Sequence, residues 1–299
     1  MTAELDHIGI VGPDLDALEA AFGRLGFRVA PRCELVALDE NGGATPMGQV
    51  NSHLVFGDSY VELTAVRGDR SAHHLRDAIA RYWGLHIVVL RTADADAQQA
   101  RLKRGGSLAP APALAGRHVS YPGGSGLARF RWFRIPEAEF PEAFLCEVEH
   151  LDRDLVFDPA LNDHPNGACG LASLSLCCER PQETARRLGD IVGSQARPGD
   201  GEWIVDAGAV QVRMLDAAGL AARFPGVTAP GLPWLAAFAV HSRDPGQSAA
   251  FLDAAGIAAT SGEDRIWASP DRAGGVIVEF LGANSRGRDT AGAHEDSAT

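Results

Sequence analysis

Two ionisable side chains stand on segments that otherwise alternate between apolar and polar residues. His7 lies in the run 5–11 (LDHIGIV), and Glu62 lies in the run 59–66 (SYVELTAV). Both runs are typical of half-buried strands, in which alternation places a single polar side chain on a face free of other charge. A buried carboxylate facing a histidine must be paired, hydrogen-bonded or bound to a metal, because an isolated charge in an apolar site costs on the order of several kcal/mol. We therefore expect chemistry to centre on this pair.

The elements that position this pair form a unit of one strand, one helix and three strands. The first strand is followed by Pro13-Asp14, and then by apolar residues at helical spacing, with Asp14 as the expected N-cap and Gly26 as the expected stop. Strand-like runs follow at 27–29, 52–56 and 60–65. The unit therefore opens with the strand that carries His7 and closes with the strand that carries Glu62.

The same plan returns three times along the chain, and such repeats indicate the architecture. The second unit opens at residue 85 with LHIVVL, which carries His86, and closes at 143–150, where Glu147 and Glu149 are two residues apart and share one face. The third unit opens at 171–178 and the fourth at 235. When the helices of the units are aligned, four other residues fall at the two key positions: Ser173 and Ala236 for the histidine, Arg213 and Glu279 for Glu62. The third and fourth units therefore lack the set of histidines and carboxylates that the first two units carry.

Composition excludes several classes of protein. The 299 residues carry a net charge of −12 with no basic cluster, which argues against a nucleic-acid partner. Apolar runs are too short to span a bilayer, and no signal peptide opens the chain, so we expect no membrane association. Five cysteines without paired CxxC spacing indicate a reducing compartment, and we expect a cytoplasmic protein.

Four units of this kind, opening with LDHIGIVGPDLDAL and closing the first with FGDSYVEL, resemble the vicinal oxygen chelate superfamily, and the DHPNGA segment at 163–168 resembles its glyoxalase-like domain proteins. The resemblance implies an α+β fold of tandem βαβββ modules of the glyoxalase/bleomycin-resistance/dioxygenase type, with four modules forming two cup-shaped domains. The first cup would be residues 1–150 (modules 1–68 and 84–150), followed by a linker at 151–168, a second cup at 169–284 without metal ligands, and a disordered tail at 285–299.

In that superfamily, the first and last strands of paired modules supply metal ligands. The resemblance therefore implies His7 and Glu62 from the first module, and His86 with Glu147 or Glu149 from the second. Two imidazoles with one or two carboxylates suit a divalent ion such as Fe, Mn, Ni, Co or Zn. Glu62 and Glu149 are the candidates for proton transfer. The alternative is that the opening histidine is held by hydrogen bonds, with Glu62 as its partner and no metal.

Four further residues are candidates for substrate contact. Asn51 and His53 alternate on the third strand of the first module, so they share the face expected to line the cup. His118 and Tyr121 precede a Gly-rich turn and would border its mouth, although an exposed loop is the alternative for them.

The expected function is that of a metal-dependent lyase, isomerase or dioxygenase that acts on a small oxygenated organic substrate in the first cup. Ser173 and Ala236 make ring cleavage in the later domain a poor fit. The rival is a metal-free binding or drug-sequestering protein of the same fold, its cup lined by aromatic groups such as Phe130, Trp132, Trp83 and Trp234, which could equally be core. Modules can pair within one chain or be exchanged between two chains, so the sequence is compatible with a homodimer.

Overall fold

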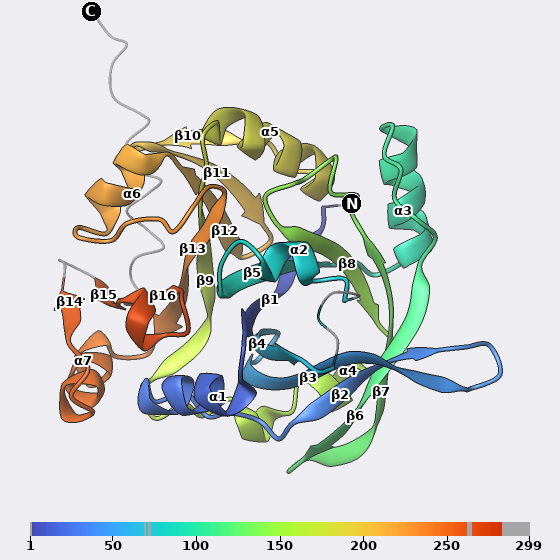
Figure 1. Ribbon diagram of the computed structural model, residues 1–299, viewed down its shortest axis with the longest axis horizontal. Helices are drawn as coiled ribbons and strands as arrows, with labels where there is room; N and C mark the ends of the chain where they lie inside the picture. The colour runs from blue at the N-terminus through green and yellow to red at the C-terminus, as the bar shows by residue number, and fades with distance from the viewer. Residues whose placement is uncertain (1, 69, 71–72, 262–264, 283–299) are drawn as a thin grey trace, which may run out of the picture.

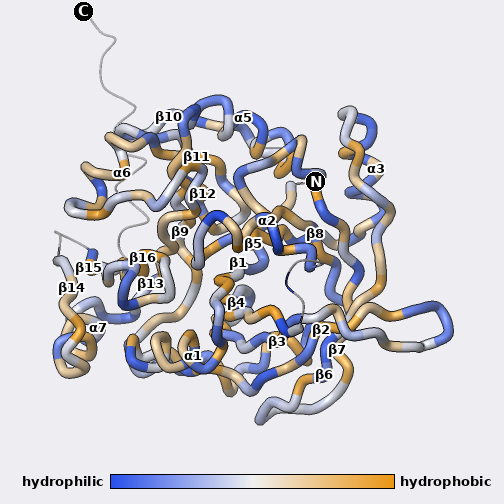
Figure 2. The backbone as a smooth tube through the Cα atoms, in the orientation of Figure 1, coloured by the Kyte–Doolittle hydropathy of each residue, from blue (hydrophilic) through white to orange (hydrophobic). Residues whose placement is uncertain are grey.

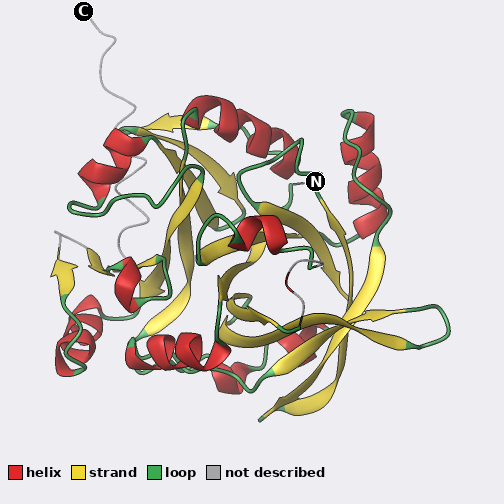
Figure 3. Cartoon of the chain, viewed as in Figure 1, coloured by secondary structure: helices red, strands yellow, loops and turns green. Residues whose placement is uncertain are grey.

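The computed structural model describes residues 2–68, 70, 73–261 and 265–282, so the tail expected at 285–299 lies outside the described residues. Within these ranges the chain is α+β, with helices packed on one continuous network of sixteen strands (Figures 1 and 3). No helix in the described part of the chain is long and apolar enough to cross a membrane.

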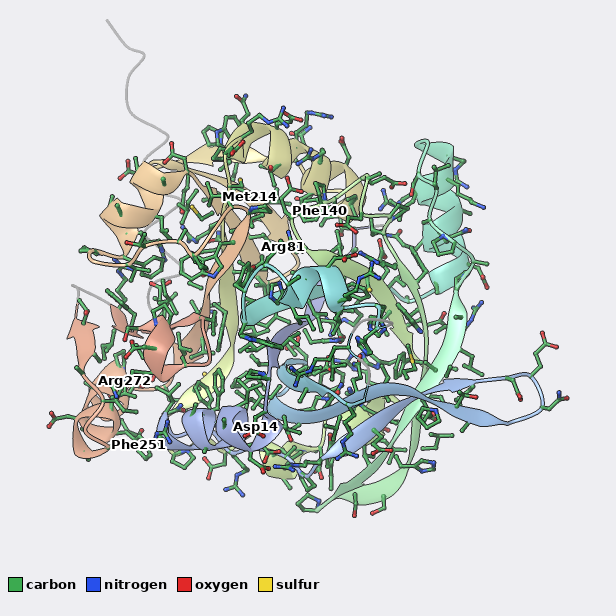
Figure 4. All side chains as sticks on the ribbon, in the orientation of Figure 1. Asp14, Arg81, Phe140, Met214, Phe251 and Arg272 are labelled. Atoms are coloured by element: carbon green, nitrogen blue, oxygen red, sulfur yellow. The ribbon has the colours of Figure 1, made fainter. Side chains whose placement is uncertain are left out.

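The first module has the predicted order. It consists of β1 (Glu4–Gly12), α1 (Leu15–Arg24), β2 (Cys33–Leu38), β3 (Ala44–Phe56) and β4 (Ser59–Val66). β1 and β4 run parallel to each other, and β4, β3 and β2 form an antiparallel meander. Asp14, labelled at the start of α1 in Figure 4, accepts a hydrogen bond from the Asp16 backbone N–H, and Gly26 follows the helix with a φ of 84°. Both predicted helix signals are therefore confirmed.

The second module repeats this arrangement. After the short helix α2 (Arg76–Ile79) come β5 (Gly84–Arg91), α3 (Ala95–Arg104), β6 (Ala113–Tyr121), β7 (Gly124–Arg134) and β8 (Phe144–His150). β5 pairs with β8 in parallel, as β1 does with β4. Asp94 caps α3 through the Ala97 backbone N–H, as Asp14 caps α1.

The two modules close on each other within this one chain. β1 and β5 pair antiparallel, and at the opposite seam β2 pairs with β6, so eight strands form a ring in the order β1-β4-β3-β2-β6-β7-β8-β5. Each strand therefore presents one face to the interior of this ring, the first cup, and the other face to the outside. The outer faces of β1 and β5 belong to an apolar cluster that includes Ile8, Val88 and, from α1, Phe22.

The third and fourth modules form the other half of the molecule, at the left and top of Figure 1. The third module contains β9 (Ala168–Cys177), α5 (Pro181–Val192), β10 (Arg197–Gly199), β11 (Glu202–Ala207) and β12 (Val210–Leu215). α6 (Ala217–Arg223) follows. The fourth module contains β13 (Trp234–Ser242), α7 (Pro245–Ala254), β14 (Ala259–Ser261), β15 (Arg265–Ala268) and β16 (Ile277–Gly282). β9 and β13 pair antiparallel, and the Leu85–Leu235 pair joins β13 to β5.

The second cup is filled by the chain itself. Leu220 of α6 and the following Phe224 pack in one buried cluster with Trp234, Trp267 and Ile277. Figure 2 shows apolar residues running along the strands of both halves, and a large apolar cluster continues between them. The described part of the second half therefore has a packed aromatic and aliphatic cluster, whereas the first half has a cavity.

The segment between the halves is structured. It contains α4 (Arg153–Val156) and a 3₁₀ turn at Pro159–Leu161. The ring of His164 accepts a hydrogen bond from the Arg28 backbone N–H at Nδ1 and donates from Nε2 to the carbonyl of Val55. Burial lowers the pKa of His164 to about 4, which keeps the ring neutral for this bridging role.

Candidate functional site

The first cup encloses a cavity with two chemically different walls. Its polar side comes from β1, β3, β4 and β6 and contains His7, Gln49, Tyr60, Glu62 and Arg117. Its other side comes from β5, β7 and β8 and is mainly apolar, with Ile87, Val89, Phe130, Trp132, Phe144 and Val148. The cavity therefore suits a small molecule that carries oxygen functions at one end and an apolar body at the other.

His7 and Glu62 meet in this cavity, as their strands predict. Nε2 of His7 lies 3.7 Å from Oε2 of Glu62 and 3.3 Å from the Tyr60 hydroxyl. β1 and β4 are parallel with His7 beside Tyr60 and Gly9 beside Glu62, so all three polar side chains reach the same interior face. The His7 and Tyr60 rings stack with centroids 4.1 Å apart.

A β-bulge adds Asp6 to the site. Leu5 pairs with Leu90 of β5 and His7 pairs with Val89, so Asp6 is an extra residue without a cross-strand partner. Its carboxylate accepts hydrogen bonds from Nδ1 of His7 at 2.7 Å and from Nε2 of His150 at 3.0 Å. Two imidazoles at the cup thus share one fully buried carboxylate.

The charge on Asp6 is stabilised by these partners. Burial by itself would raise the pKa of this carboxyl, but the charge of His150 and the hydrogen bonds from both rings outweigh it and hold the pKa well below its usual range. Asp6 is therefore ionised at neutral pH. Because it accepts the Nδ1 proton of His7, the lone pair of Nε2 faces Glu62 and the cavity.

Arg117 organises the neighbouring wall. Its Nη1 donates to Nε2 of His53 at 2.8 Å, and its Nη2 donates to the Tyr60 hydroxyl at 3.1 Å. Nδ1 of His53 lies 3.1 Å from the Tyr121 hydroxyl, so this ring is neutral and carries its proton on Nδ1. Burial, followed by the charge of Arg117, holds the pKa of His53 well below its ordinary value.

The structure does not bring His86 to the cup. It lies on the outer face of β5, stacked on Tyr82 at 4.1 Å, and its Nε2 donates to the Tyr82 carbonyl at 2.7 Å. His7 lies seven positions before the cap Asp14, and the same spacing before the cap Asp94 leads to Ile87. The sequence alignment was therefore wrong by one residue, and one residue moves a strand side chain to the opposite face.

Glu147 and Glu149 also face away from the cavity. Glu147 accepts a hydrogen bond from Gln98 of α3, and Glu149 accepts one from the Ala95 backbone N–H at the start of that helix. The inner face of β8 is formed by Phe144, Cys146, Val148 and His150. Both faces of β8 are covered, one by α3 and one by the cup, so alternation alone did not show which face lies inside.

The four substrate candidates divide. His53 and Tyr121 are buried on the inner face but lie behind Arg117 and do not line the cavity. Asn51 is buried on β3, the strand that also carries His53, and its Oδ1 has no hydrogen-bond partner among the described residues. His118 is exposed and alternates with Arg117, so it points outward. Of the aromatic candidates, Phe130 and Trp132 line the cavity, whereas Trp234 lies in the second half and Trp83 is partly exposed.

Sequence reasoning missed four residues that the structure places at the site: Asp6, Tyr60, Arg117 and His150. Strand alternation could have predicted Tyr60 and His150, because each lies two residues from an inner-face residue, Glu62 for Tyr60 and Val148 for His150. Arg117 sits between two glycine- and alanine-rich stretches with no local motif. Asp6 enters through a bulge that no feature of the sequence signals.

The donor set does not fit the divalent metal expected from the resemblance. Strand register places Val89 beside Cys146 in the second module, as it places Gly9 beside Glu62 in the first, and Ile87 stands where His7 does. Burial raises the pKa of Cys146 well above its usual range, so this sulfur stays a protonated thiol. No group of three or more His, Cys, Asp or Glu side chains in the described ranges is arranged to hold a metal. Of the four positions implied by the resemblance, only His7 and Glu62 carry metal-ligating groups, and His150, which also borders the cavity, binds Asp6 through Nε2. First-row metal sites have three or four protein ligands.

Paired βαβββ modules around a cup define the vicinal oxygen chelate fold, and comparisons with known proteins agree. A family model described as a glyoxalase-like domain matches residues 5–192, which is more than half of the chain. The chain therefore belongs to the glyoxalase-like domain family. A comparison with curated proteins finds no significant match.

Three solved structures share the fold. A hypothetical protein from Staphylococcus aureus is 11% identical, with a TM-score of 0.64 and coverage of 94% of this chain and 99% of that one. A mutant 4-hydroxymandelate synthase from Streptomyces coelicolor is 14% identical, with a TM-score of 0.58 and coverage of 95% and 93%. An Mn(II)-bound glyoxalase from Novosphingobium aromaticivorans is 15% identical, with a TM-score of 0.55 and coverage of 94% and 82%. At these identities the likeness concerns the fold alone.

Proposed function

We propose that the first cup is the active site of an enzyme of the lyase or isomerase class, which moves a proton on a small oxygenated organic molecule. One observation carries this proposal: a 2.7 Å hydrogen bond to Asp6 orients the His7 ring, so that Nε2 of His7 points towards Glu62 and both side chains border the cavity. A carboxylate behind an imidazole fixes its tautomer and stabilises its protonated form. Two proton-accepting groups thus face the same space.

The side chains divide the work as follows. Glu62 or His7 accepts a proton from a carbon next to an oxygen function of the substrate, and the same group, which then carries that proton, returns it at the neighbouring atom. Asp6 keeps the His7 ring in place and stabilises its positive charge while the proton is held. The Tyr60 hydroxyl receives a hydrogen bond from Arg117 and lies 3.3 Å from Nε2 of His7, so it turns its own proton to a substrate oxygen once Nε2 carries a proton. The apolar wall excludes water from the reacting atoms.

The expected divalent metal would find only His7 and Glu62 among the residues that belong to the predicted ligand set. Bound there, such an ion would polarise a substrate oxygen. Ile87 and Cys146 occupy the other two ligand positions, so the proton transfer depends on the protein's own side chains. The packed second half, whose Glu279 is paired with Arg223 and Arg265, acts as a brace for the first.

Solvent exchange tests the proposal without knowledge of the product. The full chain is incubated in D₂O with a panel of small 2-hydroxy and 2-oxo compounds, and loss of the carbon-bound proton next to the oxygen is followed by NMR. We expect exchange on at least one compound, with Glu62→Gln and His7→Ala each slowing it by about 100-fold. Glu179→Gln makes the same chemical change at an exposed position outside the cup and should leave the rate unchanged. Equal rates in all four proteins would refute the assignment.

A metal-free binding protein is the second candidate, and the aromatic residues Phe130, Trp132 and Phe144 favour it. Under this alternative, a compound binds stoichiometrically but shows no exchange, and Glu62→Gln leaves its affinity within about twofold. Exchange and affinity measured on the same compound therefore separate the two functions.

A further inference from the structure

Arg117 is a buried cation with unused hydrogen-bonding capacity. The residue is only 3% exposed, yet it borders the cavity of the first cup. A guanidinium carries five N–H donors. Its terminal nitrogens contact His53 and Tyr60, both neutral side chains, and its Nε has no hydrogen-bond partner in the described part of the chain.

The charge of Arg117 also lacks a direct counter-ion. No Asp or Glu in the described ranges lies within 4.0 Å of it. The aromatic face of Tyr60 lies 5.1 Å from its Cζ atom, and Glu62, which borders the same cavity, favours its charge from a longer distance. By contrast, Arg223 and Arg265 in the second half both pair with the buried carboxylate of Glu279. Burying a charge without a directly paired counter-ion is unfavourable, and a bound anion would offset this cost.

The opposite wall determines the rest of the ligand. Phe130, Trp132 and Phe144 present aromatic surface to the cavity, and His74 packs against Phe144 with ring centroids 5.2 Å apart. Desolvation of its ring lowers the pKa of His74 to about 4, although the residue as a whole is exposed, so this ring is neutral at pH 7 and adds no charge to that wall. A flat apolar body would be covered on this side while a charged end faces Arg117.

We propose that the ligand of the first cup is a small carboxylate with a flat apolar or aromatic body, and that Arg117 binds its carboxylate. This inference deepens the proposed function, on which it rests for the identity of the ligand site. The planar fork of a guanidinium matches the two oxygens of a carboxylate. A monoanion fits better than a dianion such as phosphate, because Glu62 and Asp6 already place negative charge in the same cup.

Equilibrium binding of benzoate and its neutral isostere benzamide tests this inference. Titration calorimetry on the full chain should show benzoate binding at least tenfold more tightly than benzamide, a ratio typical of a hydrogen bond to a charged group. Arg117→Met should reduce this ratio to about one. Arg117→Lys keeps the charge but loses the planar fork, so an intermediate ratio is expected.

Three controls keep the outcome clear. Arg104→Met, at an exposed position on α3, should bind benzoate as the unmodified protein does. His7→Ala should retain the preference for benzoate while losing proton exchange, so that failure of the catalytic proposal and failure of this one are distinguishable. Equal affinity of the unmodified protein for benzoate and benzamide would overturn the inference even if Arg117→Met does not fold. Competition by inorganic phosphate as strong as that by benzoate would overturn the choice of a carboxylate.

Discussion

Asp6 and His7 are neighbours in the sequence, and both reach the same buried site. Consecutive residues of a regular strand point to opposite faces, so a hydrogen bond of 2.7 Å between their side chains requires the bulge that leaves Asp6 without a partner on β5. The same carboxylate also holds His150 from the last strand of the second module. The local irregularity thus joins the two modules at the candidate base.

Replacement of Asp6 tests this arrangement. Asp6→Asn should lower the proton-exchange rate by about tenfold or more, mainly in kcat, because the amide no longer stabilises a protonated His7. The measurement is the exchange rate as a function of substrate concentration. A change confined to KM would contradict the positioning role.

The same variant changes the acid dependence of stability. The pKa of Asp6 is lowered on folding, so its contribution to stability is present above the ordinary carboxyl pKa of about 4 and is lost as the pH falls below that value. Thermal unfolding followed between pH 7 and pH 3 should therefore show a shallower acid decline in Asp6→Asn than in the unmodified protein. An identical decline in the two proteins would show that Asp6 is not the group responsible.

Metal content is the next prediction. Protein purified without chelator should contain no stoichiometric first-row metal by elemental analysis, because Ile87 and Cys146 replace two of the four ligands implied by the family. One metal ion per chain that disappears in His7→Ala would contradict this expectation. The double variant Ile87→His/Cys146→Glu should gain a divalent site, since both positions border the same cavity as His7 and Glu62. A folded double variant without added metal affinity would show that the four positions do not converge.

Glu147 should make folding stability fall as the pH rises, which is opposite to the effect of Asp6. Burial raises its pKa to about 7 despite the hydrogen bond from Gln98. The folded state therefore favours the protonated acid, and the associated stability is full below the unfolded pKa and is lost as the pH rises toward and through 7. Glu147→Gln should remove this loss and raise the free energy of unfolding at pH 8 by on the order of 3 kcal/mol at most, at about 1.4 kcal/mol per pKa unit. Chemical denaturation at pH 5 and pH 8, with Glu179→Gln as the control, measures the difference.

A substitution at Glu279 tests whether the second half stabilises the protein without contributing to the ligand site. It is fully buried and accepts hydrogen bonds from Arg223 at 3.0 Å and from Arg265 at 2.8 Å. Glu279→Gln removes the buried carboxylate that both partly buried guanidinium groups contact, so we expect a loss of about 3–5 kcal/mol in the free energy of unfolding. Benzoate affinity in the first cup should stay within about twofold at temperatures where the variant is folded. A loss of binding without a loss of stability would place Glu279 in the ligand site and contradict the assignment.

The repeat pattern, the helix caps and the alternation of the opening and closing strands were enough to predict the module order and the meeting of His7 with Glu62. These features are local, because side-chain alternation and capping depend on residues a few positions apart. The same local patterns indicated that the third and fourth modules lack this set of histidines and carboxylates. The packing of Phe224 and Leu220 into that half shows what replaces it.

The sequence-based predictions were wrong where a shift of one residue decides which strand side chain faces the cavity. His86 and Ile87 are adjacent in a run that is apolar on both sides, and Glu147 and Cys146 are adjacent in a strand covered on both faces, so hydrophobicity did not identify the inner residue. Pairing between β1 and β5 and between β5 and β8 made that choice. The sequence by itself determined the modules and the first half of the site. Only the tertiary structure decided the partners Asp6, Arg117 and His150, because a bulge and the closure of a ring of strands depend on contacts between residues far apart in the chain.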